Sequence, residues 1–254
     1  MQLVNQDRKF TSINFDKTTS TQSEALKLFN KAGCGNFIVT AKMMTNGRGR
    51  NGNIWIAKEG NLNFTMFISS NLDLINLTYL PFALSLALSE LINELLDKTV
   101  KISIKWPNDI LIDGKKLAGI LVETGLKAAS KKLYYLNIGM GINIENHPKI
   151  ADRETTSLSE YSNKLFKASE LIEPLRMKIL LWLDKVNEYQ WSDLKKLWLE
   201  RAYHFGREII TTYKNEKISG IFEDLGTEGE LVMRLHDDQK IEIKSGIVEI
   251  IEKR

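Results

Sequence analysis

The hydrophobic pattern of the first 140 residues predicts several β-strands and two helices. Short apolar or alternating runs between glycines and polar turns are typical of strands. These runs cover residues 13–15, 37–41, 62–68, 100–106, 110–112, 115–123 and 133–138. An apolar stripe with helical spacing ends at Gly33, and Thr21 with Glu24 has the spacing of a capping box at its start. A second, more apolar helix is expected over residues 79–96.

The pattern changes in the second half of the chain. Helices are expected at about 168–190 and 192–203. Beyond His204, short alternating runs follow one another at residues 208–213, 218–222, 230–235, 241–243 and 247–251. Short strands at this spacing are typical of a small β-barrel. We therefore expect two domains, 1–203 and 204–254.

Composition indicates an ordinary globular protein of 254 residues, with 43% hydrophobic and 26% charged residues. A net charge of +3 is too small to indicate nucleic acid or membrane as a partner, so any anion binding must be local. The single Cys34 excludes an intrachain disulfide, and one cysteine with three histidines provides no metal-ligand cluster. No signal-peptide pattern occurs at the N-terminus. These features are typical of a cytoplasmic enzyme.

One lysine in the stretch KWPNDILIDGKKLAGILVE stands in an unexpected position. Asp113-Gly114 predicts a two-residue hairpin turn, because both central positions of a type I′ turn need a positive φ. The next strand then places Lys116 on the same face as Ala118 and Ile120. An ammonium group on an apolar face is costly unless an anion meets it. Lys116 therefore either extends to solvent at the strand end or is directed at a ligand, and the neighbouring motifs favour the ligand.

The segment GRGRNG, residues 47–52, satisfies the G-x-G-x-x-G pattern of dinucleotide-binding loops. That interpretation requires a helix after the loop, whereas residues 53–56 are extended and aromatic in pattern. We therefore expect no Rossmann site. Glycines allow backbone amides to approach a ligand closely, and the guanidinium groups of Arg48 and Arg50 suit carboxylate or phosphate oxygens. The alternative is a solvated, flexible loop.

Three further segments carry polar groups suited to a ligand. Ser20 and Gln22 lie at a helix start, where they are either local polar residues or a hydroxyl and an amide for a ureido-like ring. Asp109 is either an Asx-turn or capping residue, or an acceptor for Mg²⁺ or a ligand hydroxyl. Asn143, in GMGIN, either closes a strand or reaches an adenine or ribose.

In this order the segments resemble the biotin–protein ligases (biotin–acetyl-CoA-carboxylase ligases) along nearly the whole chain. The motifs concerned are Ser20-Thr21, GRGRNGNIW (47–55), Gly60-Asn61-Leu62, KWPND (105–109), KLAGILVE (116–123) and GMGIN (139–143). The segment FGREI (205–209) is similar to the small C-terminal domain of that family. KWPND followed by the KLAGILVE hairpin is the most specific of these signals.

The resemblance implies an α/β (α+β) catalytic domain similar to class II aminoacyl-tRNA synthetases, with an SH3-like β-barrel behind it. It also implies a reaction in two steps that uses ATP and Mg²⁺. A carboxylate oxygen of biotin attacks the α-phosphate of ATP, which gives biotinyl-5′-AMP and pyrophosphate. A lysine of a biotin carboxyl-carrier protein domain then takes the biotinyl group.

The family's functional residues map onto this chain as follows. The expected catalytic residues are Lys116, Arg48 and Arg50, with Lys116 where the biotin carboxylate and the α-phosphate meet. The expected biotin-binding residues are Ser20, Thr21, Gln22, Arg48, Gly49, Arg50, Lys116 and Gly119. The expected ATP-binding residues are Trp55, Asn108, Asp109, Lys116 and Asn143, and Asp109 is also the candidate Mg²⁺ ligand.

Three residues depart from the family pattern. Met44 stands where many members have a biotin-contacting glutamine, Asn53 where many have a phosphate-binding arginine, and Gln22 where asparagine is usual. We expect these changes to affect affinity more than the type of reaction.

The expected partners are biotin, ATP and the acceptor domain, with a homodimer left open. Only about a dozen residues precede the first strand, too few for a helix-turn-helix, so neither DNA binding nor a repressor role is expected. No membrane partner is expected either. Two other functions stay open: a lipoate or octanoate ligase or transferase of related fold, and a non-catalytic module whose barrel binds protein or RNA.

Overall fold

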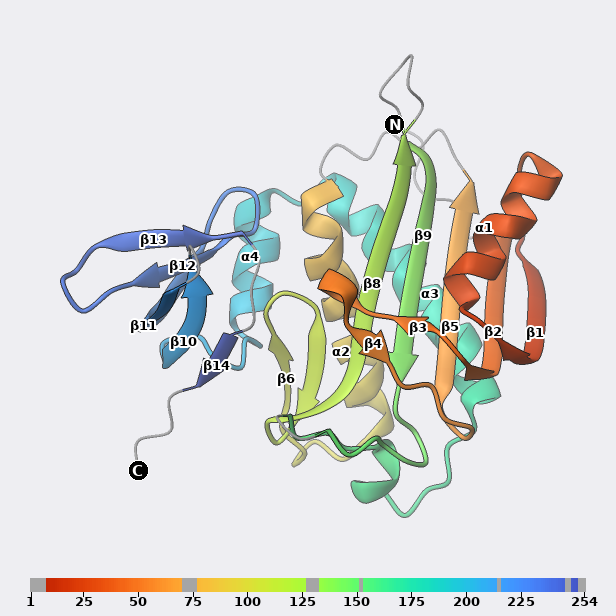
Figure 1. Ribbon diagram of the computed structural model, residues 1–254, viewed down its shortest axis with the longest axis horizontal. Helices are drawn as coiled ribbons and strands as arrows, with labels where there is room; N and C mark the ends of the chain where they lie inside the picture. Colours follow the sequence, from red (N-terminus) through yellow and green to blue (C-terminus); the bar gives the residue numbers. More distant parts are fainter. Residues whose placement is uncertain are drawn as a thin grey trace.

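The computed structural model describes residues 8–69, 77–126, 133–150, 153–213, 216–244 and 248–250. In these residues a seven-stranded sheet is followed along the chain by a five-stranded sheet, and a two-stranded ribbon lies over the larger one (Figure 1). The strands of the large sheet, in spatial order, are β1 (Thr11–Thr18), β2 (Asn36–Met44), β5 (Leu62–Ser69), β9 (Leu133–Ile142), β8 (Lys115–Leu126), β7 (Asp109–Ile112) and β6 (Ile102–Lys105). β1 and β2 pair in parallel, and all other neighbours pair antiparallel.

Helices cover both faces of this sheet, and the alternation of side chains decides what each face packs against. Phe37 and Val39 of β2 pack with α1 (Thr21–Ala32), whereas Ile38 belongs to the main core on the opposite face. That core is filled by α2 (Leu80–Leu95) and α3 (Ala168–Glu188). The remaining helical segments are α4 (Trp191–Leu199), η1 (Arg50–Gly52), η2 (Leu77–Tyr79) and η3 (Leu158–Glu160).

The helices expected from the sequence are present, and α2 is as deeply buried as its apolar pattern predicted. Eleven of its residues are buried, among them Ser85 and Ser89, whose hydroxyl groups donate to backbone carbonyls within the same helix. In the described part of the chain, no helix has the length and apolarity needed to cross a membrane.

The capping box predicted for α1 is wrong. The helix begins at Thr21, so that Ser20 is the N-cap residue, and Ser20 makes no side-chain capping bond. The Thr21 hydroxyl instead accepts from Thr65 Oγ1 at 2.8 Å, and Glu24 accepts from Thr18. Thr21 and Glu24 therefore bond to other side chains instead of capping the helix. The predicted end of the helix is confirmed, because Gly33 has the left-handed φ of 74° that stops it.

The hairpin of β7 and β8 turns at Asp113 and Gly114, with φ values of 49° and 82°, as predicted. The prediction that Lys116 shares a face with Ala118 and Ile120, however, was wrong. Leu111 pairs with Lys116 and Ile110 with Ala118, so Leu117 is an extra residue that forms a β-bulge. Side chains before the bulge therefore point to the opposite face from the one that simple alternation predicts. Lys116 leaves the core side of the sheet.

The five-stranded sheet has the order β13 (Lys240–Ile243), β12 (Leu231–Arg234), β11 (Glu216–Leu225), β10 (Glu208–Tyr213) and β14 (Val248–Ile250). It is antiparallel throughout, which confirms the mixed α/β fold with a small C-terminal β domain. Its loop after β11 is held by two indoles of the larger part of the chain. Trp106 Nε1 donates to Gly229 O at 3.0 Å, and Trp191 Nε1 donates to Gly226 O at 2.9 Å.

Candidate active site

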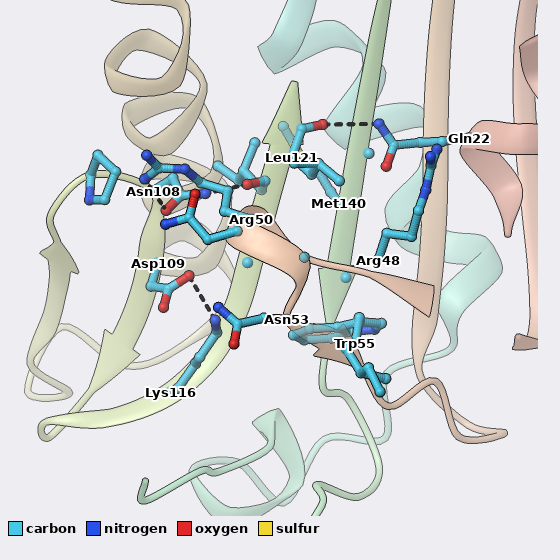
Figure 2. A pocket seen from close by; sticks show the side chains of 18 of the residues that line it. Gln22, Arg48, Arg50, Asn53, Trp55, Asn108, Asp109, Lys116, Leu121 and Met140 are labelled. Atoms are coloured by element: carbon cyan, nitrogen blue, oxygen red, sulfur yellow. Dashed lines mark hydrogen bonds and ion pairs between the residues drawn. The ribbon is translucent and has the colours of Figure 1, made fainter. Parts of the chain in front are cut away.

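A cavity of about 1020 Å³, including its open mouth, lies against the large sheet beneath the strap of residues 47–55. Eleven of the twelve predicted site residues line it: Ser20, Thr21, Gln22, Arg48, Gly49, Arg50, Trp55, Asn108, Asp109, Lys116 and Gly119. They come from the start of α1, from the strap and from the β7–β8 hairpin, segments far apart in the sequence (Figure 2).

Asn143 is the predicted residue that the structure does not bring to the cavity lining. Its side chain is 1% exposed, and Nδ2 donates to Thr156 O at 3.0 Å. The backbone of Asn143 also donates to Leu117 O. The residue thus joins β9 to the segment that follows, and its contact with ATP stays a prediction.

Lys116 and Asp109 form an ion pair inside the cavity, with 2.7 Å between Nζ and Oδ1 (Figure 2). Their side chains are only 15% and 20% exposed. Gly119 makes room for the pair, because a Cβ at that position would lie 3.3 Å from Nζ and 3.4 Å from Oδ1. Lys116 neither extends to solvent nor faces the apolar core. It is a cation held at the cavity wall by one carboxylate, and Asp109 begins β7 instead of capping a turn.

The strap consists of β3 (Gly47–Arg48), η1 and β4 (Ile54–Trp55), so no helix follows GRGRNG and the absence of a Rossmann loop is confirmed. Arg48 is fixed by an ion pair with Glu123 at 3.0 Å. Arg50 lies over the hairpin and donates to Asn108 Oδ1 at 3.5 Å. Burial lowers the pKa of Arg50 below its ordinary value, and the nearby Asp109 opposes this shift. The strap therefore brings two arginine side chains to the cavity, Arg48 near Gln22 and Arg50 near Asn108 (Figure 2).

Two glycines of β9 allow side chains to lie flat against the sheet. A Cβ at Gly141 would lie 2.2 Å from Trp55, and one at Gly139 would lie 2.6 Å from Gln22. Trp55 is further held by a hydrogen bond from Nε1 to Asn63 Oδ1 at 3.2 Å. The glycines of GMGIN thus shape the cavity floor, a use that needs no contact between Asn143 and the ligand.

The end of the cavity near α1 is polar, and the paired charges of Arg48 and Glu123 lie beside it (Figure 2). Gln22 Nε2 donates to Leu121 O and Asn137 O, both at 3.2 Å, which leaves the carbonyl oxygen of its amide toward the cavity (Figure 2). Within the described residues neither this oxygen nor the hydroxyl of Ser20 has a hydrogen-bond partner. Met44 lines the same end, and its sulfur accepts from Thr21 N at 3.4 Å. This end suits a ligand that donates hydrogen bonds.

Sequence reasoning missed several lining residues. Lys105 and Trp106 belong to the KWPND motif but were given no role. Arg153, from the polar stretch after β9, and Val248, from β14, had no local signal, because only the folded chain brings them to the cavity. Val248 shows that the C-terminal sheet supplies part of the wall.

Asp109 is the acidic residue that lines the cavity, and in the described residues no group of three or more His, Cys, Asp or Glu side chains could hold a metal ion. A Mg²⁺ ion is typically bound by one or two carboxylates together with substrate phosphates. A single carboxylate beside a cation-lined cavity fits that mode of binding and does not fit a metal site built from protein ligands alone.

Comparison with known proteins identifies the family. Residues 12–143 match the biotin/lipoate A/B protein ligase family, and residues 204–250 match the biotin protein ligase C-terminal domain. The chain belongs to the biotin/lipoate A/B protein ligase family.

Individual proteins are similar over most of the chain. It is 28% identical over 223 residues to a biotin–[acetyl-CoA-carboxylase] ligase of Paracoccus denitrificans, covering 86% of this chain and 92% of the relative. It is 29% identical over 239 residues to the bifunctional ligase/repressor BirA of Bacillus subtilis, covering 90% and 70%. The structure of the Aquifex aeolicus biotin protein ligase in complex with biotin and ATP superimposes with a TM-score of 0.76 and 28% identity, covering 96% of this chain and 99% of that one.

Proposed function

We infer that this chain is an ATP-dependent biotin–protein ligase, which makes biotinyl-5′-AMP and transfers the biotinyl group to a lysine of an acceptor protein. The observation that carries this function is that Lys116, a cation held at the cavity wall by Asp109, lines one cavity together with the polar groups of α1 and the arginines of the strap. The similarity to a ligase solved with biotin and ATP supports the same substrates.

In the first step the polar end of the cavity near α1 receives the ring of biotin. The unpaired oxygens of Ser20 and Gln22 accept hydrogen bonds from the ureido N–H groups, with Thr21 beside them. The biotin carboxylate then lies toward Lys116. One carboxylate oxygen forms a bond to the α-phosphorus, and the bond to the β-phosphate oxygen breaks with release of pyrophosphate.

The main barrier to the reaction is the approach of two anionic reactants. Lys116 holds these reactants together. Phosphoryl transfer is catalysed mostly by positioning and by stabilisation of developing charge. Asp109 keeps Lys116 at the cavity wall before ATP binds, since the ion pair is largely buried. Asp109 would also hold Mg²⁺, which neutralises phosphate charge when it is bound with ATP. Trp55 and Asn108 are the proposed neighbours of the nucleotide.

The strap protects the product of this step. The mixed anhydride of biotinyl-5′-AMP is hydrolysed if water reaches it, and closing a site against water prevents such side reactions. Gly49 lines the cavity between Arg48 and Arg50, and the Arg48–Glu123 pair ties the strap to β8. In the second step the acceptor amine attacks the anhydride carbonyl, loses a proton, and releases AMP.

Several finer statements are proposed with this function. The acceptor is a biotin carboxyl-carrier protein domain, and the enzyme is cytoplasmic, without a DNA or membrane partner. Residues 1–203 form the catalytic domain, and residues 204–254 the small C-terminal domain. A homodimer is compatible with this activity.

The function is tested by incubating labelled biotin, ATP and Mg²⁺ with a carboxyl-carrier domain. The protein as it stands should label the acceptor and release pyrophosphate, and Lys116→Ala should do neither at a comparable rate. Lys98→Ala, at an exposed lysine outside the cavity lining, is the control. Absence of both adenylate and labelled acceptor with the unmodified protein would refute the function. Competition by lipoate or octanoate stronger than by unlabelled biotin would point to the related lipoate activity instead.

A further inference from the structure

The cations that the strap and the β7–β8 hairpin bring to the cavity are already largely committed to protein partners. Arg48 is paired with Glu123, and Lys116 with Asp109. Arg50 is partly buried and bonded to Asn108. A nucleoside triphosphate brings several negative charges into a cavity, and those on its outer phosphates need cations beyond these.

Arg153 is brought to the cavity edge by the backbone beside Lys116. Lys116 N donates to Glu154 O and Thr156 N donates to Lys116 O, both at 2.9 Å, so the segment after Arg153 runs alongside the start of β8. Arg153 thereby lines the main cavity and also a second groove that leads away from it. The two concave regions share this one residue.

The second groove is cationic. Lys115 and Lys149 line it together with Arg153, and within the described residues no carboxylate lies within 4 Å of the charged groups of these three residues. Glu154 is the acidic residue of the lining, and it is exposed. His147, also in the lining, is bonded on both ring nitrogens, to Thr155 and Glu160.

We propose that Arg153, Lys149 and Lys115 form a polyphosphate-binding track, which holds the β- and γ-phosphates of ATP and then the pyrophosphate that leaves. This inference rests on the proposed function, because it assigns the leaving group of its first step. When the bond between the α-phosphorus and the bridging oxygen breaks, that oxygen and its electron pair go with the pyrophosphate. The track neutralises this added charge, and no proton needs to be supplied by the protein.

The composition of the groove distinguishes this role from binding of the adenine base. No Phe, Tyr or Trp is found among the residues that line it, so it offers cations for oxygens in place of a large aromatic face for a base. Arg153 presents a planar fork suited to two phosphate oxygens, and Lys149 adds a flexible charge farther out.

The test measures the binding of inorganic pyrophosphate and the binding of biotin separately, both on the full chain. Arg153→Gln should weaken the binding of pyrophosphate by about tenfold or more, because a charge-assisted contact is lost. The weaker binding should be seen both in product inhibition and in direct calorimetric titration. The KM for ATP should rise similarly, while the Kd for biotin stays unchanged. Arg153→Lys should recover part of the effect, Lys149→Gln should show a smaller loss, and Lys98→Gln should show none.

Other outcomes overturn the proposal in recognisable ways. Unchanged pyrophosphate inhibition in Arg153→Gln would refute the polyphosphate-binding track and would leave the proposed ligase function standing. Weaker AMP binding with unchanged pyrophosphate binding would make Arg153 a contact for the nucleoside. Equal weakening of biotin and pyrophosphate would indicate a general disturbance of the cavity. An unmodified protein that makes no adenylate would refute the proposed function itself.

Discussion

Lys116 Nζ lies 2.7 Å from Asp109 Oδ1, across a position that Gly119 leaves open. The two side chains come from opposite strands of one hairpin, and both are largely shielded from solvent. The pair fixes a cation before any substrate arrives. Because the site is preorganised, less reorganisation is needed when the anionic substrates bind.

Replacement of Lys116 should therefore affect adenylate formation more than substrate binding. Lys116→Ala is expected to lower the rate of ATP–pyrophosphate exchange by a factor of about a hundred or more, which is typical for removal of one preorganised charge-stabilising group. Lys116→Arg keeps the charge but changes its shape, and its exchange rate should fall between those of the unmodified protein and Lys116→Ala. Full activity of Lys116→Ala would refute the assigned role without affecting the fold.

Removal of the Glu123 carboxylate should loosen the strap. Arg48 and Glu123 are 40% and 32% exposed, so their ion pair contributes less than about 1 kcal/mol to global stability. Glu123→Gln should leave the unfolding midpoint in urea nearly unchanged but increase hydrolysis of bound biotinyl-5′-AMP several-fold, because water enters more easily. Arg48→Gln combined with Glu123→Gln should be no worse than Arg48→Gln alone. Additive effects in this cycle would contradict coupling through the pair.

A methyl group at Gly141 should displace Trp55. The added Cβ would lie 2.2 Å from the indole, far inside contact distance. Gly141→Ala is expected to cost roughly 1–3 kcal/mol of stability, the usual range for overpacking, and to weaken ATP binding. The double variant Gly141→Ala, Trp55→Ala removes the clash and should be as stable as Trp55→Ala. If the double variant were less stable than Trp55→Ala, the clash would lie with a residue other than Trp55.

Stability should fall in acid partly because of His204. Burial, helped by Lys105 and Arg207, lowers the pKa of His204 from 6.5 to about 3. Below pH 6.5 the unfolded chain therefore binds a proton that the folded chain does not, and stability decreases as pH falls toward 3. At pH 5 this group should cost about 2 kcal/mol relative to pH 8.

The variant His204→Gln isolates this contribution. Urea unfolding of both proteins at pH 8 and pH 5 should show a smaller loss of stability in the variant, by about the same 2 kcal/mol. An equal pH dependence in the two proteins would mean that His204 is protonated as easily in the folded chain as in the unfolded one.

The sequence by itself determined the elements, the family motifs and most of the site. Asp113-Gly114 predicted its turn and Gly33 the end of α1, because a positive φ is a local property of the chain. The predicted site residues converge on one cavity, with Asn143 as the exception, because the motifs that contain them lie at strand ends and turns of one sheet face. Their individual roles remain to be tested by the variants above.

Only the tertiary structure decided which side chains face one another. The bulge at Leu117 moved Lys116 to the cavity face, and the period of two in a strand cannot reveal an extra residue. Thr21 lost its predicted cap because Thr65, distant in sequence, offered a buried partner. Arg153 reached the cavity only through backbone pairing beside β8. Contacts of this kind depend on long-range packing, which local sequence patterns do not encode.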